Sequence, residues 1–248
     1  MQPPGNKIER SLLKFAGWFV AIIVVLVATG VLGYREVHDW QQRRLVAQAN
    51  ALVDRGDYKH ASLDARRLLQ INPENAEGCR IMARISERAG VRSALDWRRR
   101  VVELSSPKPS DFIALGRAAI RFGDWQNVSF ALSRIGDPDK RSADYHALLA
   151  DVAGARHDGN EMARQLEEAV RLGPTKKENI LRLAILRLSA SDAKIRDEGL
   201  QTLHGLQGEP SLRREATRSL IEDAIREKRA GTALELARTL DALPERNF

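Results

Sequence analysis

Five arginines recur at helical spacing in two nearby stretches of the chain. Arg80, Arg84 and Arg88 follow one another every four residues, and Arg117 and Arg121 repeat that interval. Residues four apart lie on one face of a helix, so each set presents its guanidinium groups together. Guanidinium groups bind carboxylates and phosphates through forked hydrogen bonds. These positions therefore form a candidate surface for an acidic ligand.

The same arginines also fit an ordinary solvated helix face. Glu77 and Glu87 lie close enough along the chain to pair with them locally, which would neutralise part of the charge. The run Arg98-Arg99-Arg100 is expected on the following helix, where it faces partly outward as surface or membrane-proximal charge. The sequence alone leaves both interpretations open.

No catalytic or cofactor-binding motif stands out. The chain has no Gly-rich phosphate loop, no His-Glu-x-x-His and no Gly-x-Ser-x-Gly. The only cysteine, Cys79, excludes an intrachain disulfide and is expected to be a small buried apolar residue. The five histidines show no metal-ligand spacing and are His38, His60, His146, His157 and His204. We therefore expect a chain that is not an enzyme and binds no metal or cofactor.

The composition is that of a helical protein with a net positive charge. The 248 residues are 43% hydrophobic and 29% charged but only 5% aromatic, and alanine, leucine and arginine dominate. The net charge of +7 and the isoelectric point near 9.8 favour an acidic partner. An anionic membrane surface, an acidic protein segment and nucleic acid all satisfy that condition.

One apolar stretch near the amino end predicts a membrane anchor. Residues 15–33 contain no charged side chain, and about 20 such residues cross a bilayer core of about 30 Å. The competing interpretation is a cleavable signal peptide with Ala28-Thr29-Gly30 at the cleavage site. We favour the anchor because the apolar stretch is longer than that of a signal peptide.

The orientation of this anchor is weakly specified. Three basic residues precede the span and three follow it closely, so the positive-inside rule does not decide. We expect a cytoplasmic amino tail and the large domain on the far side, which is the periplasm in a Gram-negative bacterium. The expected domains are a polar tail at 1–14, a transmembrane helix at 15–34, a juxtamembrane segment at 35–40 and a helical domain at 41–248.

The helical domain is organised around the segment from Arg55 to Pro73. Gly56 and Tyr58 belong to a tight turn, and Ala61 and Ala65 are small residues one helical turn apart. The segment resembles the second half of a tetratricopeptide repeat (TPR), which recurs about every 34 residues.

The rest of the chain repeats this pattern. The turn glycines Gly56, Gly90 and Gly123 are 34 and 33 residues apart, and the third unit also has Gly116 and Trp125 at positions that resemble the family pattern. Six residues taken as equivalent small positions are spaced by 33, 34, 35, 36 and 34 residues: Ala61, Ala94, Val128, Ala163, Gly199 and Ala233. We therefore expect an all-α protein in which an amino-terminal transmembrane helix precedes a solenoid of about six TPR-like hairpins.

The resemblance also implies how such a chain works. In TPR proteins the first helices of the hairpins line a concave groove that holds a peptide or helix of a partner, and the five arginines fall on first helices. The chain is therefore expected to be a membrane-anchored scaffold for a protein with an acidic or helical segment. The alternatives are a chaperone-like holder of membrane or secreted proteins and a non-catalytic subunit of a membrane enzyme complex. Nucleic-acid binding is disfavoured by the mixed charge and the lack of interleaved aromatic residues.

Overall fold

The computed structural model describes residues 39–104 and 106–243, and in these ranges all regular structure is helical. The all-α fold expected from the repeats is thereby confirmed for the described residues. None of their helices has the length and apolar character needed to cross a membrane. The anchor predicted at 15–34 and the polar tail before it lie outside the described residues.

The described helices fall into two compact units, which divide between Ile81 and Met82. The first unit contains the helix over residues 39–54, α2 (Tyr58–Ile71) and the start of α3 (Ala76–Arg88). Fully buried small side chains, among them Ala61, Ala65 and Cys79, make up much of its interior. The buried Cys79 agrees with the role expected from the sequence.

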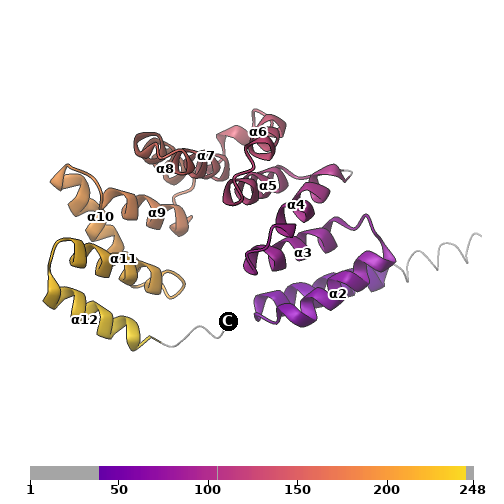
Figure 1. Cartoon of the computed structure of the whole chain (residues 1–248), viewed down its shortest axis with the longest axis horizontal. Helices are drawn as coiled ribbons and strands as arrows, with labels where there is room; N and C mark the ends of the chain where they lie inside the picture. The colour runs from indigo at the N-terminus through magenta and orange to yellow at the C-terminus, as the bar shows by residue number, and fades with distance from the viewer. Residues whose placement is uncertain (1–38, 105, 244–248) are drawn as a thin grey trace, which may run out of the picture. The chain divides into compact units, whose positions relative to one another are not determined.

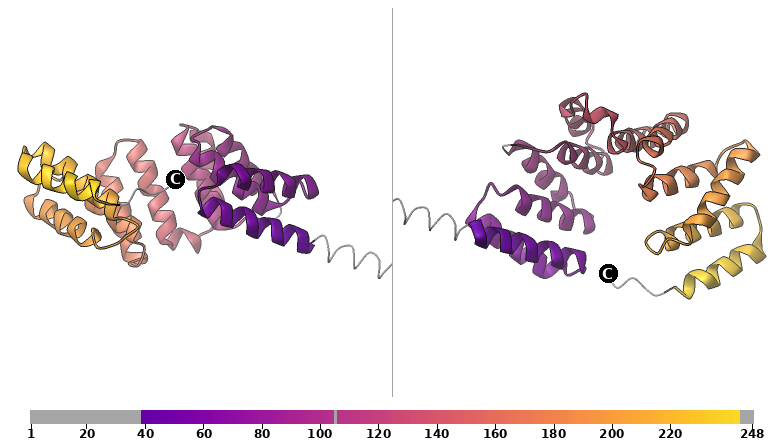
Figure 2. Two further views of the ribbon diagram at one scale, coloured as in Figure 1. Left: turned by 90° about the horizontal axis from the view of Figure 1, so that it is seen from below. Right: turned by 180° about the vertical axis from the view of Figure 1, so that it is seen from behind.

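The second unit takes up the rest of α3 and continues through nine further α-helices of the described chain. They are α4 (Ser93–Glu103), α5 (Pro109–Arg121), α6 (Trp125–Arg134), α7 (Ala143–Ala155), α8 (Gly159–Leu172), α9 (Lys177–Arg187), α10 (Ala193–Leu206), α11 (Arg213–Arg226) and α12 (Ala230–Asp241), with a 3₁₀ turn η1 (Asp139–Arg141) before α7. Within this unit the helices follow one another in chain order and pack in successive pairs (Figures 1 and 2). We call the helix over residues 39–54 together with α3, α5, α7, α9 and α11 first helices, and α2, α4, α6, α8, α10 and α12 second helices.

Left-handed turn residues join the first and second helices. Gly56, Gly90 and Gly123 have φ angles of 80°, 70° and 68°, a conformation that glycine adopts without steric cost. Their predicted turn role is therefore confirmed. In the later pairs the same conformation is taken by His157 and Lys228, with φ of 59° and 57°.

An aspartate usually follows the turn and caps the second helix. Asp57 accepts a hydrogen bond from the backbone N–H of His60, and Asp124 accepts one from that of Asn127. The donated bonds hold the pKa of both carboxyl groups below the ordinary value. Because the caps fix where each second helix begins, they make Tyr58 and Trp125 the first residues of α2 and α6.

The expected small positions are buried in most units. Ala61 and Ala94 are fully buried, and Pro73 follows Asn72, the residue that caps the end of α2. Gly116 is also buried, and a Cβ atom there would come within 3.0 Å of Leu148 on α7. Neighbouring first helices approach closely at this point because one of them has no side chain.

One of the six positions taken as equivalent is wrong. In the fourth unit Ala163 is only partly buried, and the preceding Met162 packs against the core cluster of Leu166 and Leu183. A spacing that varies by one residue between units shifts a position to the neighbouring side of the helix. In the sixth unit Ala233 keeps the register of Ala61, five residues after the left-handed turn residue, but it is only partly buried because α12 buries none of its residues.

Replacing Gly199 by alanine is expected to lower the free energy of unfolding by about 1–2 kcal/mol. The new Cβ would lie 2.9 Å from the carbonyl oxygen of Ala184 and 3.0 Å from the Cβ of Arg187. This overpacking outweighs the helix propensity that alanine gains over glycine, about 0.5–1 kcal/mol. Urea unfolding followed by circular dichroism measures the difference.

Gly205 on the same helix provides the matched control. An added Cβ there meets no atom within 4 Å, so Gly205→Ala should leave the stability unchanged or raise it. Equal effects of the two substitutions would contradict the close contact at Gly199.

Candidate functional site

The candidate site is a cleft of about 450 Å³ in the second unit. It opens beside α5, and apolar side chains of that helix form part of its wall together with charged groups from α3, α4, α5 and α7. The lining residues are Glu87, Arg98, Ser110, Ile113, Ala114, Arg117, Ala118, Arg121 and Asp144. Three guanidinium groups and two carboxylates therefore line the same cleft.

The start of α5 is fixed by its own capping interactions. The helix begins at Pro109 after Lys108, whose backbone N–H donates to the carboxylate of Asp111 at 2.8 Å. The cap residue is therefore Lys108, and Asp111 contributes to the cap from inside the helix. This cap sets the helical register that turns Arg117 and Arg121 toward the cleft.

Arg98 is the most firmly held of the three arginines. Its Nε and Nη2 donate to the two carboxylate oxygens of Glu87, each at 2.7 Å, and its side chain is only 12% exposed. The run Arg98-Arg99-Arg100 lies on a second helix, as expected, and Arg100 is exposed, but Arg98 itself is not a surface charge. Arg98 instead reaches back from α4 to α3 and places a neutralised pair in the wall of the cleft.

Arg117 lies in a row of charges that crosses three first helices. Its Nε donates to Asp151 Oδ2 on α7 at 3.2 Å, and the other oxygen of that carboxylate accepts from Arg182 on α9. The Arg117 side chain remains 47% exposed. Two of its nitrogens are not used in this contact, so it can still donate to a ligand.

Arg121 acts at the end of the preceding first helix. Its Nη1 donates to the backbone carbonyl oxygen of Glu87 at 2.8 Å, close to the carboxyl end of α3. A cation is favourable there because the last carbonyls of a helix carry partial negative charge. Arg226 makes the same kind of bond to the carbonyl of Leu188 at 3.3 Å.

The remaining predicted arginines lie on α3. Arg80 belongs to the first unit and forms an ion pair with Glu77 at 2.6 Å. This is the local pairing expected for a solvated helix face. Arg84 and Arg88 belong to the second unit and also take part in interactions within the protein. Of the five predicted groove arginines, the cleft itself brings together Arg117 and Arg121.

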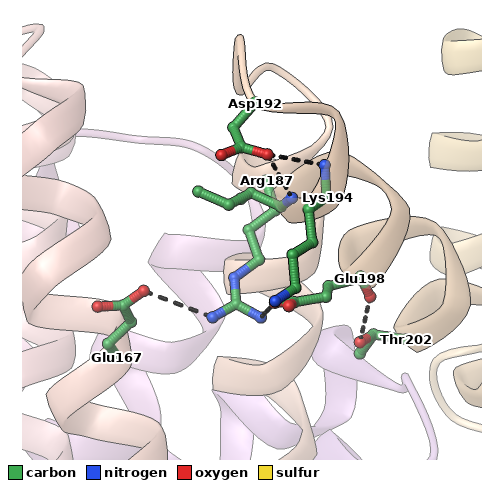
Figure 3. Close-up of polar contacts among 7 residues, drawn as sticks. Glu167, Arg187, Asp192, Lys194, Glu198 and Thr202 are labelled. Atoms are coloured by element: carbon green, nitrogen blue, oxygen red, sulfur yellow. Dashed lines mark hydrogen bonds and ion pairs between the residues drawn. The ribbon is translucent and has the colours of Figure 1, made fainter.

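A separate ion-pair cluster ties α8, α9 and α10 together. Arg187 lies between Glu167 and Glu198, with 3.4 Å to each carboxylate (Figure 3). Asp192 caps the start of α10 beside it. Arg187 thus joins carboxylates of two helices, while Asp192 accepts from the backbone N–H groups of Lys194 and Ile195. The cluster holds consecutive helix pairs together.

The described residues show no grouping suited to a metal. In residues 39–104 and 106–243, no three His, Cys, Asp or Glu side chains are placed to hold a metal ion together. Three of the described histidines have side-chain partners: His60 contacts Asp57, His146 contacts Gln165 and His204 contacts Gln207.

The fold is that of TPR proteins, as the sequence resemblance indicated. PilW, a type IV pilus biogenesis factor, is similar with a TM-score of 0.64 and 14% identity, over 81% of this chain and 92% of that one. PilF of Pseudomonas aeruginosa is similar with a TM-score of 0.62 and 14% identity, over 82% and 91%. TTC0263, a TPR protein of Thermus thermophilus, has a TM-score of 0.59 and 21% identity, over 72% and 98%. No protein-family model and no curated protein sequence matches the chain.

Proposed function

We propose that this chain is a non-catalytic scaffold that binds a segment of another protein along its first helices. The observation that carries the proposal is the open cleft of about 450 Å³ beside α5, where Arg117 keeps donors free next to apolar wall residues. An acidic segment, extended or helical, suits this combination because its carboxylates meet guanidinium groups and its apolar side chains meet α5.

The scaffold is held at a membrane in this proposal. Residues 15–33 provide a stretch of sufficient length without charge, and the helical domain lies on the far side from the amino tail, in a bacterial periplasm. Anchoring raises the effective concentration of a weak binding site for partners in the same membrane. The similar fold of PilW, a type IV pilus biogenesis factor, supports an assembly role rather than a catalytic one.

The charges in the cleft refine the kind of partner. Glu87 is engaged by Arg98, but Asp144 also lines the cleft and pairs with Lys176 at 2.7 Å. Asp144 remains 48% exposed, so a uniformly acidic segment would meet a carboxylate as well as guanidinium groups. The best fit is a segment whose acidic residues lie against Arg117, next to an apolar or basic stretch.

Replacing Arg84 and Arg117 together by glutamate is expected to abolish partner capture without unfolding the chain. Asp151 retains Arg182 when Arg117 is lost, so that carboxylate is not left without a cation. A photoreactive group at position 117 in native membranes, followed by mass spectrometry, identifies the partner, and pull-down of that partner then measures the variant.

Arg164→Glu is the matched control, since Arg164 is an exposed arginine on the second helix α8. It should leave capture unchanged. Capture that survives in the Arg84 and Arg117 variant would overturn the groove assignment. A single crosslinked partner would indicate a dedicated scaffold. Many unrelated partners would indicate a chaperone-like holder, and an enzyme activity that copurifies with the chain would indicate a subunit of a membrane enzyme.

A further inference from the structure

One edge of the second unit is formed by the turns that join each first helix to its second helix. We call it the turn edge, and its segments are residues 89–92, 122–124, 156–158, 188–192 and 227–229. Contacts link these turns across neighbouring pairs. Arg121 bonds to the carbonyl of Glu87, and Arg156 lies over the ring of Trp125 at 5.3 Å. At the far end Arg196 pairs with Glu227 at 3.3 Å.

Exposed apolar side chains gather at this edge. The described part of the second unit has five large exposed apolar residues, and only Leu234 lies away from the edge. Val91 is in the first turn and is 45% exposed, while Trp125, Ile195 and Ile225 lie within three residues of the other turns and are 39%, 41% and 63% exposed. The segments that join each second helix to the next first helix contribute none of the five. Four of the five exposed apolar residues therefore lie at the same edge of the second unit.

The charged groups of the turn edge are mostly basic toward solvent. The exposed cations in the turns or within two residues of them are Arg88, Arg92, Arg121, Arg156, Lys194, Arg226, Lys228 and Arg229. Glu227 is exposed among them and pairs with Arg196. The neighbouring aspartates Asp124, Asp158 and Asp192 accept hydrogen bonds from the backbone N–H groups of the helices that they cap. Their charge is therefore directed into the helix ends, and the field in front of the edge is positive.

The spacing of the apolar side chains indicates what kind of surface they meet. A protein interface has a contiguous desolvated core, whereas here single apolar side chains are separated by cations. A fluid bilayer interface accommodates isolated apolar side chains, favours tryptophan, and attracts lysine and arginine to anionic headgroups. We propose that the turn edge of the second unit binds the surface of a bilayer that contains anionic phospholipids. Arg121 lies at both surfaces, since it also lines the cleft, but the contact with the bilayer does not require a partner in the cleft.

The test uses the full chain reconstituted into vesicles of phosphatidylcholine, with and without phosphatidylserine. An environment-sensitive fluorophore is attached at Val91→Cys or Ile225→Cys, and a lipid-borne quencher reports contact. Cys79 is fully buried, so the introduced cysteine takes the label. We expect quenching at both positions in the phosphatidylserine vesicles and little in phosphatidylcholine alone. Asp137→Cys, in an exposed segment between α6 and η1, is the control position and should stay unquenched.

A charge variant provides the second measurement. Arg92→Gln with Lys228→Gln should lower the ratio of lipid-bound to free label about thirtyfold. Lys140→Gln with Arg141→Gln, outside the turn edge, should leave that ratio unchanged. Labels at positions 91 and 225 that stay in water in the presence of phosphatidylserine would overturn the proposal. Equal quenching at position 137, or equal effects of the two charge variants, would also overturn it.

Discussion

Replacing Arg229 by aspartate is expected to lower the free energy of unfolding of the second unit by about 3 kcal/mol. Arg229 Nη2 donates to Oδ2 of Asp223, whose side chain is 1% exposed. The described residues offer no hydrogen-bond donor to Oδ1 of that carboxylate, and Arg226 Nη2 lies 3.7 Å from it. A second carboxylate at position 229 would remove the principal counter-charge and add repulsion to a buried anion.

The other helix pairs show why this arrangement is unusual. Five residues before the left-handed turn residue, α5 and α7 have the buried apolar side chains Ala118 and Val152 where α11 has Asp223. One residue after the turn, α6 and α8 have a capping aspartate, whereas α12 has Arg229 and no side-chain cap. The sixth pair has thus exchanged a buried apolar residue and a cap for a buried ion pair.

The double variant Asp223→Val with Arg229→Asp restores the pattern of the other pairs. It is expected to be more stable than the single variant and to exceed the unmodified chain by about 1 kcal/mol, the usual contribution of a helix cap. Urea unfolding measures both variants, and amide hydrogen exchange locates the change in α11 and α12. Equal loss in the single and double variants would contradict the role of the buried pair.

Replacing Leu148 by alanine should cost about 3 kcal/mol, within the range for deleting a buried leucine side chain. Leu148 is fully buried, lies in a cluster with Ile113 and Ile135, and covers the backbone at Gly116. Its loss removes the side chain that fills the space between α5 and α7. Denaturant unfolding with an unchanged m-value would confirm a loss of packing alone.

A substitution at Gly116 tests whether this residue is in contact with Leu148. The Cβ of an alanine at 116 would lie 3.0 Å from Leu148 Cδ2, so Gly116→Ala alone should change the stability little or lower it. In the Leu148→Ala background the same substitution fills part of the vacated space and should recover about 1 kcal/mol. Strict additivity of the two substitutions would show that these residues do not share a contact.

Local features of the fold could be predicted from the sequence because they depend on residue type. Gly56, Gly90 and Gly123 occupy left-handed turns that favour glycine, and their spacing identifies the repeat. His157 and Lys228 adopt the same backbone conformation, but their residue types give no signal for it. The fourth and sixth turns therefore lack the glycine that marks the first three.

The electrostatics of the site could be predicted only in part. Side chains three or four residues apart on a helix can be paired from the sequence, and the ion pair of Arg80 with Glu77 is of this kind. The bonds of Arg117 to Asp151 and of Arg121 to the Glu87 carbonyl join residues 34 apart. Such contacts depend on how one hairpin stacks on the next, so the one-dimensional pattern showed the arginines but not what holds them.

The forked pair of Arg98 with Glu87 has a consequence for the thermodynamics of recognition. Immobilising a long side chain on binding costs about 0.5–1.5 kcal/mol in conformational entropy. Arg98 is already fixed by two hydrogen bonds and is 12% exposed, and a single hydrogen bond to Asp151 on α7 restrains Arg117 in part. This wall of the cleft is therefore pre-organised, so most of the ordering cost of complex formation falls on the incoming segment. A partner that is already helical in its free state would accordingly bind more tightly than a flexible one of the same sequence.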